Sequence, residues 1–144
     1  MKEYLSIPFQ ERQEIIQKIK QAFLKERNVI FAFVFGSFLD APSFRDIDIG
    51  IYMKDYKKSS SEVFDDELRF SIMAAETCGI SFSLIEVKIL NFAPGNLLNN
   101  ILTRGQILFS RDEKFLTDII ENTSLDAIAN EHIAQQSLYE LIPA

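Results

Sequence analysis

The chain has 144 residues, a length that fits one domain able to bury roughly 70% of its unfolded surface. Apolar residues make up 47% and charged residues 25%, which excludes a disordered tail, a collagen-like fibre and a disulfide scaffold. There are 15 Lys and Arg residues against 21 Asp and Glu residues, a net charge of −6 that disfavours binding to a naked phosphate backbone unless a metal cation supplies positive charge. We therefore expect a single domain over residues 1–144 and no direct nucleic-acid binding.

The single cysteine, Cys78, can form no internal disulfide bond, and with the single histidine, His132, it makes no zinc-binding set. Both residues are expected to be structural. The N-terminal residues lack the apolar core of a signal peptide, and no apolar stretch approaches the roughly 18 residues that a membrane span requires. The sequence predicts a cytoplasmic protein that does not enter a membrane.

The first half of the chain predicts one helix and two strands. Apolar residues recur at helical spacing after Pro8, at Ile15, Ile16, Ile19, Ala22 and Phe23. The apolar run Val29–Phe35 is rich in branched and aromatic residues, as expected of a central strand buried on both faces. From Asp46 to Met53 polar and apolar residues alternate with a period of two, which predicts a second strand.

The middle of the chain predicts a helix and a third strand. Ser59 and Glu62 form a capping-box pair at the start of the helix, and Gly79 is a typical end signal. The segment Ser81–Leu90 alternates again, so that Glu86 and Lys88 share one face of the expected strand.

The last third of the chain predicts a short helix ending at Gly105, a strand over Gln106–Ser110 and a helix capped by Asp112. Weaker helical spacing predicts a C-terminal helix over residues 124–144 that packs on the core or on a partner. The resulting fold class is α/β (α+β), with a mixed β-sheet of about four strands flanked by helices.

Two short motifs lie at the ends of the first two expected strands. Gly36 and Ser37 close the first strand, and Asp46 and Asp48 open the second. Residues two apart on a strand point the same way, with Cα atoms roughly 6.5 Å apart, so both carboxylates can converge on a cation such as Mg²⁺. Gly36 lets the backbone approach a ligand, and Ser37 offers a hydroxyl and an amide to a phosphate.

These motifs resemble the minimal nucleotidyltransferases of the DNA polymerase beta superfamily, whose signature is Gly-Ser, a gap, and then Asp-x-Asp. The segment Leu90-Asn91-Phe92-Ala93-Pro94, followed by Ile101–Phe109, is similar to the downstream part of bacterial and archaeal members that are paired with HEPN toxins. The resemblance covers about residues 10–120. It implies a polymerase-beta-like nucleotidyltransferase fold.

The resemblance also implies roles for five residues. Asp46 and Asp48 would bridge two Mg²⁺ ions, and Glu86 would complete one metal site beside the attacking hydroxyl. Gly36 and Ser37 would hold the phosphates of the substrate ATP. Three clustered carboxylates would repel one another without cations, which agrees with a site for divalent metal. The implied function is Mg²⁺-dependent transfer of AMP to a hydroxyl, a tyrosine of a HEPN toxin partner, by a protein that acts as the antitoxin.

The sequence departs from the family pattern in three places. The gap from Phe38 to Arg45 is shorter than in many relatives and lacks the Arg and Gly residues common after Gly-Ser. Arg45 stands where Ser often precedes the acidic pair, and Glu86 stands where Asp is commoner. We expect Phe38 or Phe44 to be exposed in this gap, where an aromatic ring can contact a purine.

Other interpretations stay open. The carboxylates of Asp46 and Asp48 fit a solvated strand face or a helix cap, and Glu86 fits an ion pair with Lys88 or Arg45. A protein with this fold can also neutralise a toxin by binding it without chemistry, or transfer a nucleotide to a small-molecule antibiotic. The sequence is compatible with homo- or hetero-oligomers.

Overall fold

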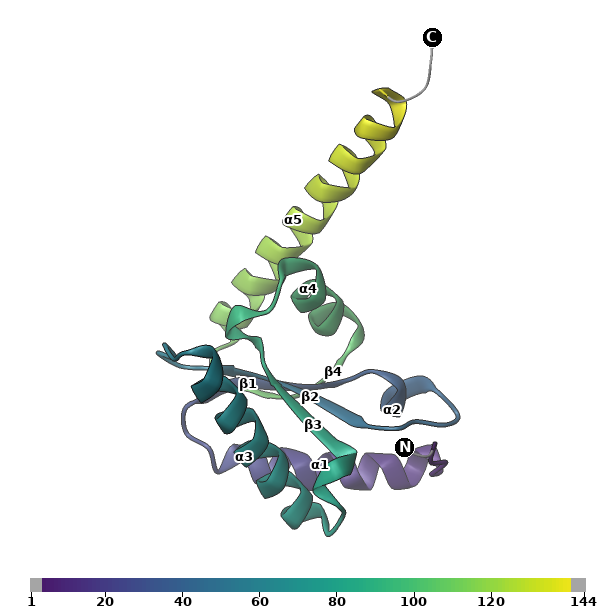
Figure 1. Ribbon diagram of the computed structural model, residues 1–144, viewed down its shortest axis with the longest axis vertical. Helices are drawn as coiled ribbons and strands as arrows, with labels where there is room; N and C mark the ends of the chain where they lie inside the picture. The colour runs from purple at the N-terminus through teal and green to yellow at the C-terminus, as the bar shows by residue number, and fades with distance from the viewer. Residues whose placement is uncertain (1–3, 141–144) are drawn as a thin grey trace.

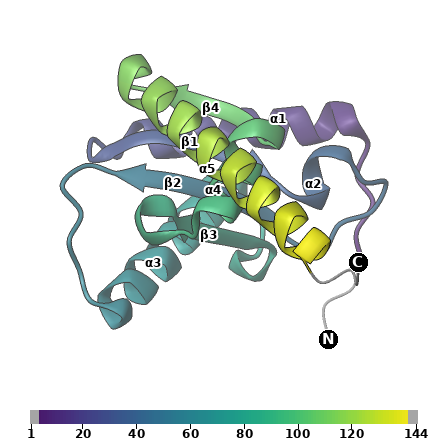
Figure 2. The same ribbon diagram turned by 90° about the horizontal axis from the view of Figure 1, so that it is seen from above.

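A four-stranded sheet lies between two pairs of helices in the computed structural model, which describes residues 4–140 and, on the last helix, side chains as far as Leu125 and at Ile128 (Figures 1 and 2). Its elements in chain order are α1 (Phe9–Leu24), β1 (Val29–Phe35), α2 (Ser37–Asp40), β2 (Ile47–Met53), α3 (Ser60–Cys78), the 3₁₀ turn η1 (Phe82–Leu84), β3 (Ile85–Ile89), the 3₁₀ turn η2 (Leu90–Phe92), α4 (Gly95–Arg104), β4 (Gln106–Ser110) and α5 (Glu113–Glu140).

The strands lie in the order β3-β2-β1-β4, and the sheet is mixed. β1 is antiparallel to both β2 and β4, whereas β2 and β3 are parallel and are joined through α3. A parallel pair requires such a crossover because the chain must return to the same end of the sheet. The predicted fold class, a mixed sheet of four strands flanked by helices, is confirmed.

The sheet buries an apolar layer on each face. On one face, Ala32 and Val34 of β1 pack with residues of α1 and α3. On the other face, Phe31 and Phe33 pack with residues of α4 and with the first turns of α5. β1 is therefore buried on both sides, which is the reason that its sequence is a continuous apolar run.

The ends of α3 follow the predicted capping chemistry. The Ser59 side chain accepts a hydrogen bond from the backbone N–H of Glu62, and the Glu62 side chain accepts one from the backbone N–H of Ser59. At the other end, Gly79 adopts the left-handed conformation with φ of 69°, which glycine allows without strain. Ser59 and Gly79 therefore set the two ends of α3. Its middle turns lie against β3.

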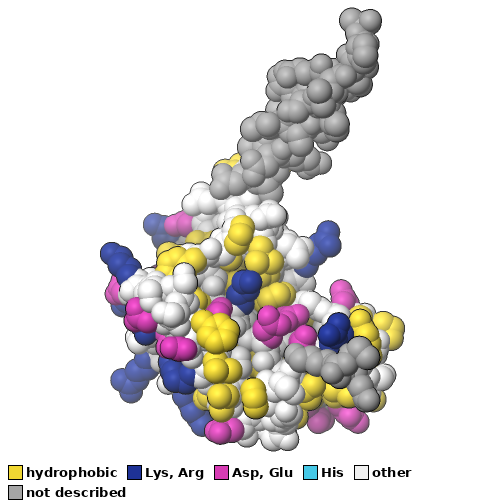
Figure 3. All heavy atoms as spheres, in the orientation of Figure 1, with side chains coloured by type: hydrophobic (Ala, Val, Ile, Leu, Met, Phe, Trp, Pro, Cys, Tyr) yellow, Lys and Arg dark blue, Asp and Glu magenta, His cyan; other side chains and the backbone are white. Residues whose placement is uncertain are grey.

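Side chains of α3 also protect the free edge of β3. The backbone N–H of Val87 donates to Oγ of Ser71 at 3.2 Å, and the N–H of Ile89 donates to Oε2 of Glu67 at 2.8 Å. An added strand would need these donors, so the two contacts oppose edge-to-edge pairing. Figure 3 shows apolar side chains gathered in the lower middle of this face. The exposed apolar residues of α3 and η1 include Phe64, Leu68, Ile72 and Phe82.

The structure differs from the expected elements at the start of β3 and in the last helix, as well as in the segment between β1 and β2 described below. Residues 82–84 form a 3₁₀ turn, and β3 begins at Ile85 because β2 begins opposite it at Ile47. The helix capped by Asp112 and the predicted C-terminal helix are one continuous helix, α5, which extends beyond the sheet in Figure 1. Residues 141–144 and the side chain of His132 lie outside what is described, so the packing of this end stays a prediction. Within residues 4–140 no helix is long and apolar enough to cross a membrane.

Candidate active site

The predicted site residues come together at one end of the sheet, where β1 ends and β2 and β3 begin. Asp48 lies opposite Phe35, the last residue of β1, and on its other side lies opposite Glu86 of β3. Gly36 and Ser37 follow directly after β1, and Asp46 directly precedes β2. Three neighbouring strands therefore bring the Gly-Ser turn and the carboxylates to one corner.

Gly36 lies close to Asp48, the second residue of the acidic pair. Its φ of 82° lies in the left-handed region, and a Cβ built on it would lie 2.5 Å from Oδ2 of Asp48. Side chains with a Cβ rarely adopt this φ, and the space is filled by the carboxylate. Glycine is the residue that lets the turn after β1 approach Asp48 this closely.

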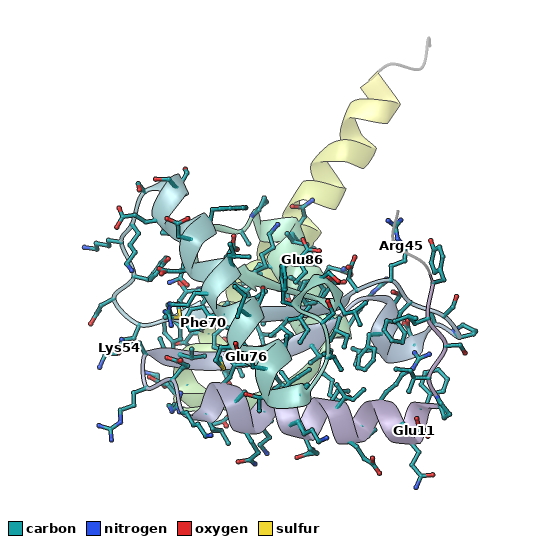
Figure 4. The ribbon with its side chains drawn as sticks, turned by 60° about the horizontal axis from the view of Figure 1, so that its bottom comes forward. Glu11, Arg45, Lys54, Phe70, Glu76 and Glu86 are labelled. Carbon is teal, nitrogen blue, oxygen red and sulfur yellow. The ribbon has the colours of Figure 1, made fainter. Side chains whose placement is uncertain are left out.

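Glu86 and Lys88 are exposed, on the face of the sheet that carries Asp48, while Ile85 and Val87 turn into the opposite core. Figure 4 shows Glu86 on the side of the sheet toward α5, away from α1 and Glu11. The predicted alternation of this strand is therefore confirmed, and it presents Glu86 to solvent beside Asp48.

The donor set suits a divalent cation whose remaining ligands come from a substrate. Among the side chains that the structure describes, no group of three or more His, Cys, Asp and Glu is placed to hold a metal ion by itself. Mg²⁺ is usually held by one or two carboxylates together with substrate phosphates and water, rather than by a complete protein cage. Asp46 and Asp48 supply such a carboxylate pair, so their chemistry fits Mg²⁺; the metal-binding roles of Asp46, Asp48 and Glu86 all stay predictions.

The segment between the two motifs is more ordered than the sequence indicates. Ser37 is exposed and begins the four-residue helix α2, for which Gly36 is the N-terminal cap. The expectation that Phe38 or Phe44 is exposed is wrong. Phe38 is 0% and Phe44 1% exposed, and their rings meet edge to face with centroids 4.7 Å apart. They are buried because they form the core beneath this segment, so they cannot stack on a purine.

Arg12 is the residue of this region that the sequence analysis missed. It lies on α1, is 1% exposed, and donates hydrogen bonds to backbone carbonyl oxygens of the segment after β1. A signal was present, because Arg12 stands four residues before Ile16 and seven before Ile19, on the apolar stripe of the helix. An arginine at such a position is buried only when its donors find partners.

A mixed sheet that joins a Gly-Ser turn to an Asp-x-Asp pair defines a domain built for nucleotidyl transfer. The family model described as Polymerase beta, Nucleotidyltransferase matches residues 17–114, and the chain belongs to this family. The polymerase-beta-like fold that the motifs imply is thereby confirmed. No curated protein matches the sequence.

Solved structures of toxin–antitoxin complexes share the fold. A chain of the complex of the tri-AMPylated Shewanella oneidensis HEPN toxin with MNT antitoxin is 15% identical, with a TM-score of 0.61 over 90% of this chain and 96% of that chain. A chain of the MntA-HepT toxin-antitoxin is 14% identical, with a TM-score of 0.60 over 89% of this chain and 96% of that chain. A toxin-antitoxin with AMP-PNP is 15% identical, with a TM-score of 0.62 over 87% and 95%.

Proposed function

We propose that this protein transfers AMP from ATP to a hydroxyl of a HEPN-domain toxin, most simply a tyrosine, and thereby acts as its antitoxin. The observation that carries the proposal is the position of Asp48, which lies against Gly36 of the Gly-Ser turn and opposite Glu86 in the sheet. The Gly-Ser turn, Asp48 and Glu86 therefore share one corner, which supports a joint role in binding the phosphates and the metal. Similar structures hold an AMPylated HEPN toxin with its MNT antitoxin, and AMP-PNP, which supports ATP as donor and a HEPN protein as acceptor.

The reaction is a substitution at the α-phosphorus of ATP. The acceptor oxygen forms a bond to that phosphorus, the bond to the bridging oxygen of the β-phosphate breaks, and pyrophosphate leaves. The backbone amide and hydroxyl of Ser37, next to Gly36, bind the phosphates, and Glu86 receives the proton of the acceptor hydroxyl. Mg²⁺ held by Asp46, Asp48 and Glu86, with two ions expected, would supply positive charge to the phosphates.

The test is transfer of label from [α-³²P]ATP with Mg²⁺ to the HEPN-domain protein that we propose as its partner. We expect labelled HEPN protein, with the label on a hydroxyl side chain identified by mass spectrometry. Asp48→Asn should abolish transfer, whereas Glu76→Gln, which removes an exposed carboxylate on α3, should keep it. Absence of label with the wild type, or undiminished transfer by Asp48→Asn, would overturn the proposal.

Neutralisation by binding alone gives a different result in cells. We expect the double variant Asp46→Asn, Asp48→Asn to bind the HEPN protein in size-exclusion chromatography and yet fail to suppress its toxicity. If this variant protects cells as well as the wild type does, the protein acts as a binding antitoxin. Label on an aminoglycoside instead of the HEPN protein would identify a small-molecule nucleotidyltransferase.

A further inference from the structure

The guanidinium group of Arg12 is fixed by backbone carbonyl oxygens. Four hydrogen bonds use its N–H donors: Nε to Ile7 at 2.7 Å, Nη1 to Phe38 at 3.0 Å, Nη1 to Ala41 at 2.7 Å and Nη2 to Pro42 at 2.9 Å. Three of the four acceptors lie in the segment that joins β1 to β2. Arg12 therefore ties α1 to the segment that carries the Gly-Ser turn.

Aromatic rings enclose the same guanidinium. Its Cζ lies 4.4 Å from the ring centroid of Phe9, 5.0 Å from that of Phe44 and 5.6 Å from that of Phe38. Cation–π contacts and charge-assisted hydrogen bonds compensate for the loss of water around the buried charge. The planar fork of arginine serves several carbonyl oxygens at once, which the single ammonium of lysine cannot do.

α2 depends on this contact for its orientation. A four-residue helix is far too short to be stable alone. The carbonyl oxygen of Ser37 accepts from the backbone N–H of Ala41, whereas that of Phe38 accepts from Arg12, outside the helix. Phe38 and Ala41, whose carbonyl oxygens bind Arg12, lie in α2 and at its C-terminal cap. Arg12 thus holds the C-terminal end of a helix whose N-terminal end is the Gly-Ser turn.

The other end of the joining segment has a separate anchor. Backbone hydrogen bonds pair Phe44 with Leu5, with N···O distances of 2.7 and 2.9 Å. This pairing fixes the residues next to Asp46 but not α2 itself. Among the described polar contacts, those that join α1 to α2 and its C-terminal cap come from Arg12.

We propose that Arg12 is a positioning residue of the nucleotide site: by binding the carbonyl oxygens of Phe38, Ala41 and Pro42, it fixes the direction in which α2 presents Ser37. Gly36, the N-terminal cap of α2, lies beside Asp48, so the direction of α2 sets the position of Ser37 relative to that carboxylate. The use of ATP in this inference rests on the proposed function, whereas the anchoring of α2 is a property of the fold.

Arg12→Lys and Arg12→Gln test the proposal, with Arg111→Gln as the matched control. Arg111 also binds backbone carbonyl oxygens through its guanidinium, those of Leu24, Glu26 and Val29, but it follows β4 and does not touch the joining segment. At a temperature at which circular dichroism shows each protein folded, the Arg12 variants should lose about 10- to 100-fold in calorimetric affinity for Mg²⁺-AMP-PNP. Their KM for ATP in AMP transfer should rise, with the KM for the HEPN protein unchanged.

The control variant should keep its nucleotide affinity within about 2-fold even where its melting temperature falls as much as that of Arg12→Lys. Arg12→Lys with wild-type affinity, or Arg111→Gln with an equal loss, would overturn the positioning role. If Arg12→Gln does not fold, Arg12→Lys carries the comparison, since it keeps the charge and the apolar stem.

Amide hydrogen exchange separates this inference from the proposed function, because it needs neither ATP nor a partner. Exchange over residues 37–42 should accelerate about 10-fold or more in Arg12→Lys, with no change over β4. If the wild type transfers no AMP but this acceleration is seen, the proposed function fails and the anchoring by Arg12 stands. Unchanged exchange over residues 37–42 would refute the anchoring, whatever the activity.

Discussion

A Cβ atom on Gly36 would lie 2.5 Å from Oδ2 of Asp48, so the turn after β1 leaves no room for a side chain at this position beside the acidic residue of β2. The two residues stand 12 positions apart in the sequence, and the pairing of Asp48 with Phe35 brings them together. A close approach of this kind couples the Gly-Ser turn to Asp48. A change at either residue should therefore affect both the phosphate-binding and the metal-binding roles that we propose.

Gly36→Ala should reduce AMP transfer by more than about 10-fold and lower the unfolding free energy by about 1–3 kcal/mol, because alanine is strained at this φ and displaces the carboxylate. Urea unfolding and the labelled-ATP assay measure the two effects. The matched control is Gly79→Ala, at φ of 69° with nothing within 4 Å of the added Cβ. It should lose similar stability and keep transfer. Equal loss of transfer in both variants would show that strain alone, rather than contact with Asp48, explains the defect.

Glu86→Gln should reduce transfer by about 100-fold or more, because it removes the carboxylate opposite Asp48 while keeping the size of the side chain. Glu86→Asp, which restores the residue commoner in the family, should keep a substantial part of the activity. The Glu86 side chain is exposed to solvent, so neither substitution should alter the melting temperature by more than a few degrees. Initial rates at saturating ATP and HEPN protein measure the effect.

Lys88→Gln is the control for charge on this strand, since Lys88 is exposed on the same face two residues further along. It should change transfer by less than about 5-fold if Glu86 acts directly rather than as the partner of Lys88 in an ion pair. A loss as large as that of Glu86→Gln would instead favour the ion-pair interpretation of Glu86.

The parts of the fold that local chemistry determines were predictable from the sequence. A period of two placed Glu86 and Asp48 on polar faces of their strands, and the capping residues Ser59 and Gly79 marked both ends of α3. The family resemblance then supplied the pairing of the two motifs, which the matched family model bears out at the level of the domain. Local pattern carries this information because strand alternation and helix caps depend on a few neighbouring residues.

The anchoring of the joining segment was not predictable in the same way. Phe38 and Phe44 stand in a short, proline-containing stretch, and they are buried against Arg12, more than 25 residues earlier in the chain. α2 has too few residues to show a helical period. The burial of Phe38 and Phe44 and the position of α2 depend on contacts between segments distant in the chain. The residue pattern of a single sequence does not indicate which of its segments contact each other.

Magnesium should control nucleotide binding. ATP at 100 times its Kd should stabilise the wild type by about 2.7 kcal/mol in thermal unfolding with Mg²⁺, and by much less with EDTA. Asp46→Asn should lose most of this shift because one carboxylate of the pair is neutral. The control Asp65→Asn removes one charge from the exposed surface of α3 and should keep the shift. An equal shift for the wild type in Mg²⁺ and in EDTA would contradict a metal-dependent site.

Stability in acid should depend on Asp66, which lies away from the candidate site. The Tyr56 hydroxyl donates to its Oδ2 at 2.6 Å, and Nζ of Lys58 lies 2.9 Å from the same atom. Both contacts lower the pKa of Asp66, and the hydrogen bond from Tyr56 has the larger effect. The unfolded chain, with an Asp pKa of about 3.9, then takes up a proton first as the pH falls. The stabilisation is therefore complete above the unfolded value and is lost as the pH falls through the folded value.

Urea unfolding of the wild type and Asp66→Asn measures this contribution. The difference in unfolding free energy should be about 1 kcal/mol at pH 7, a modest value because solvent screens the pair, and should shrink toward zero as the pH falls below about 4, the unfolded value. Tyr56→Phe should reproduce most of the loss at pH 7. Lys58→Gln should cost less, because the Lys58 side chain is 41% exposed, against 17% for Asp66. A difference between wild type and Asp66→Asn that stays constant from pH 7 to pH 2 would show that Asp66 stabilises the fold through packing rather than through its charge.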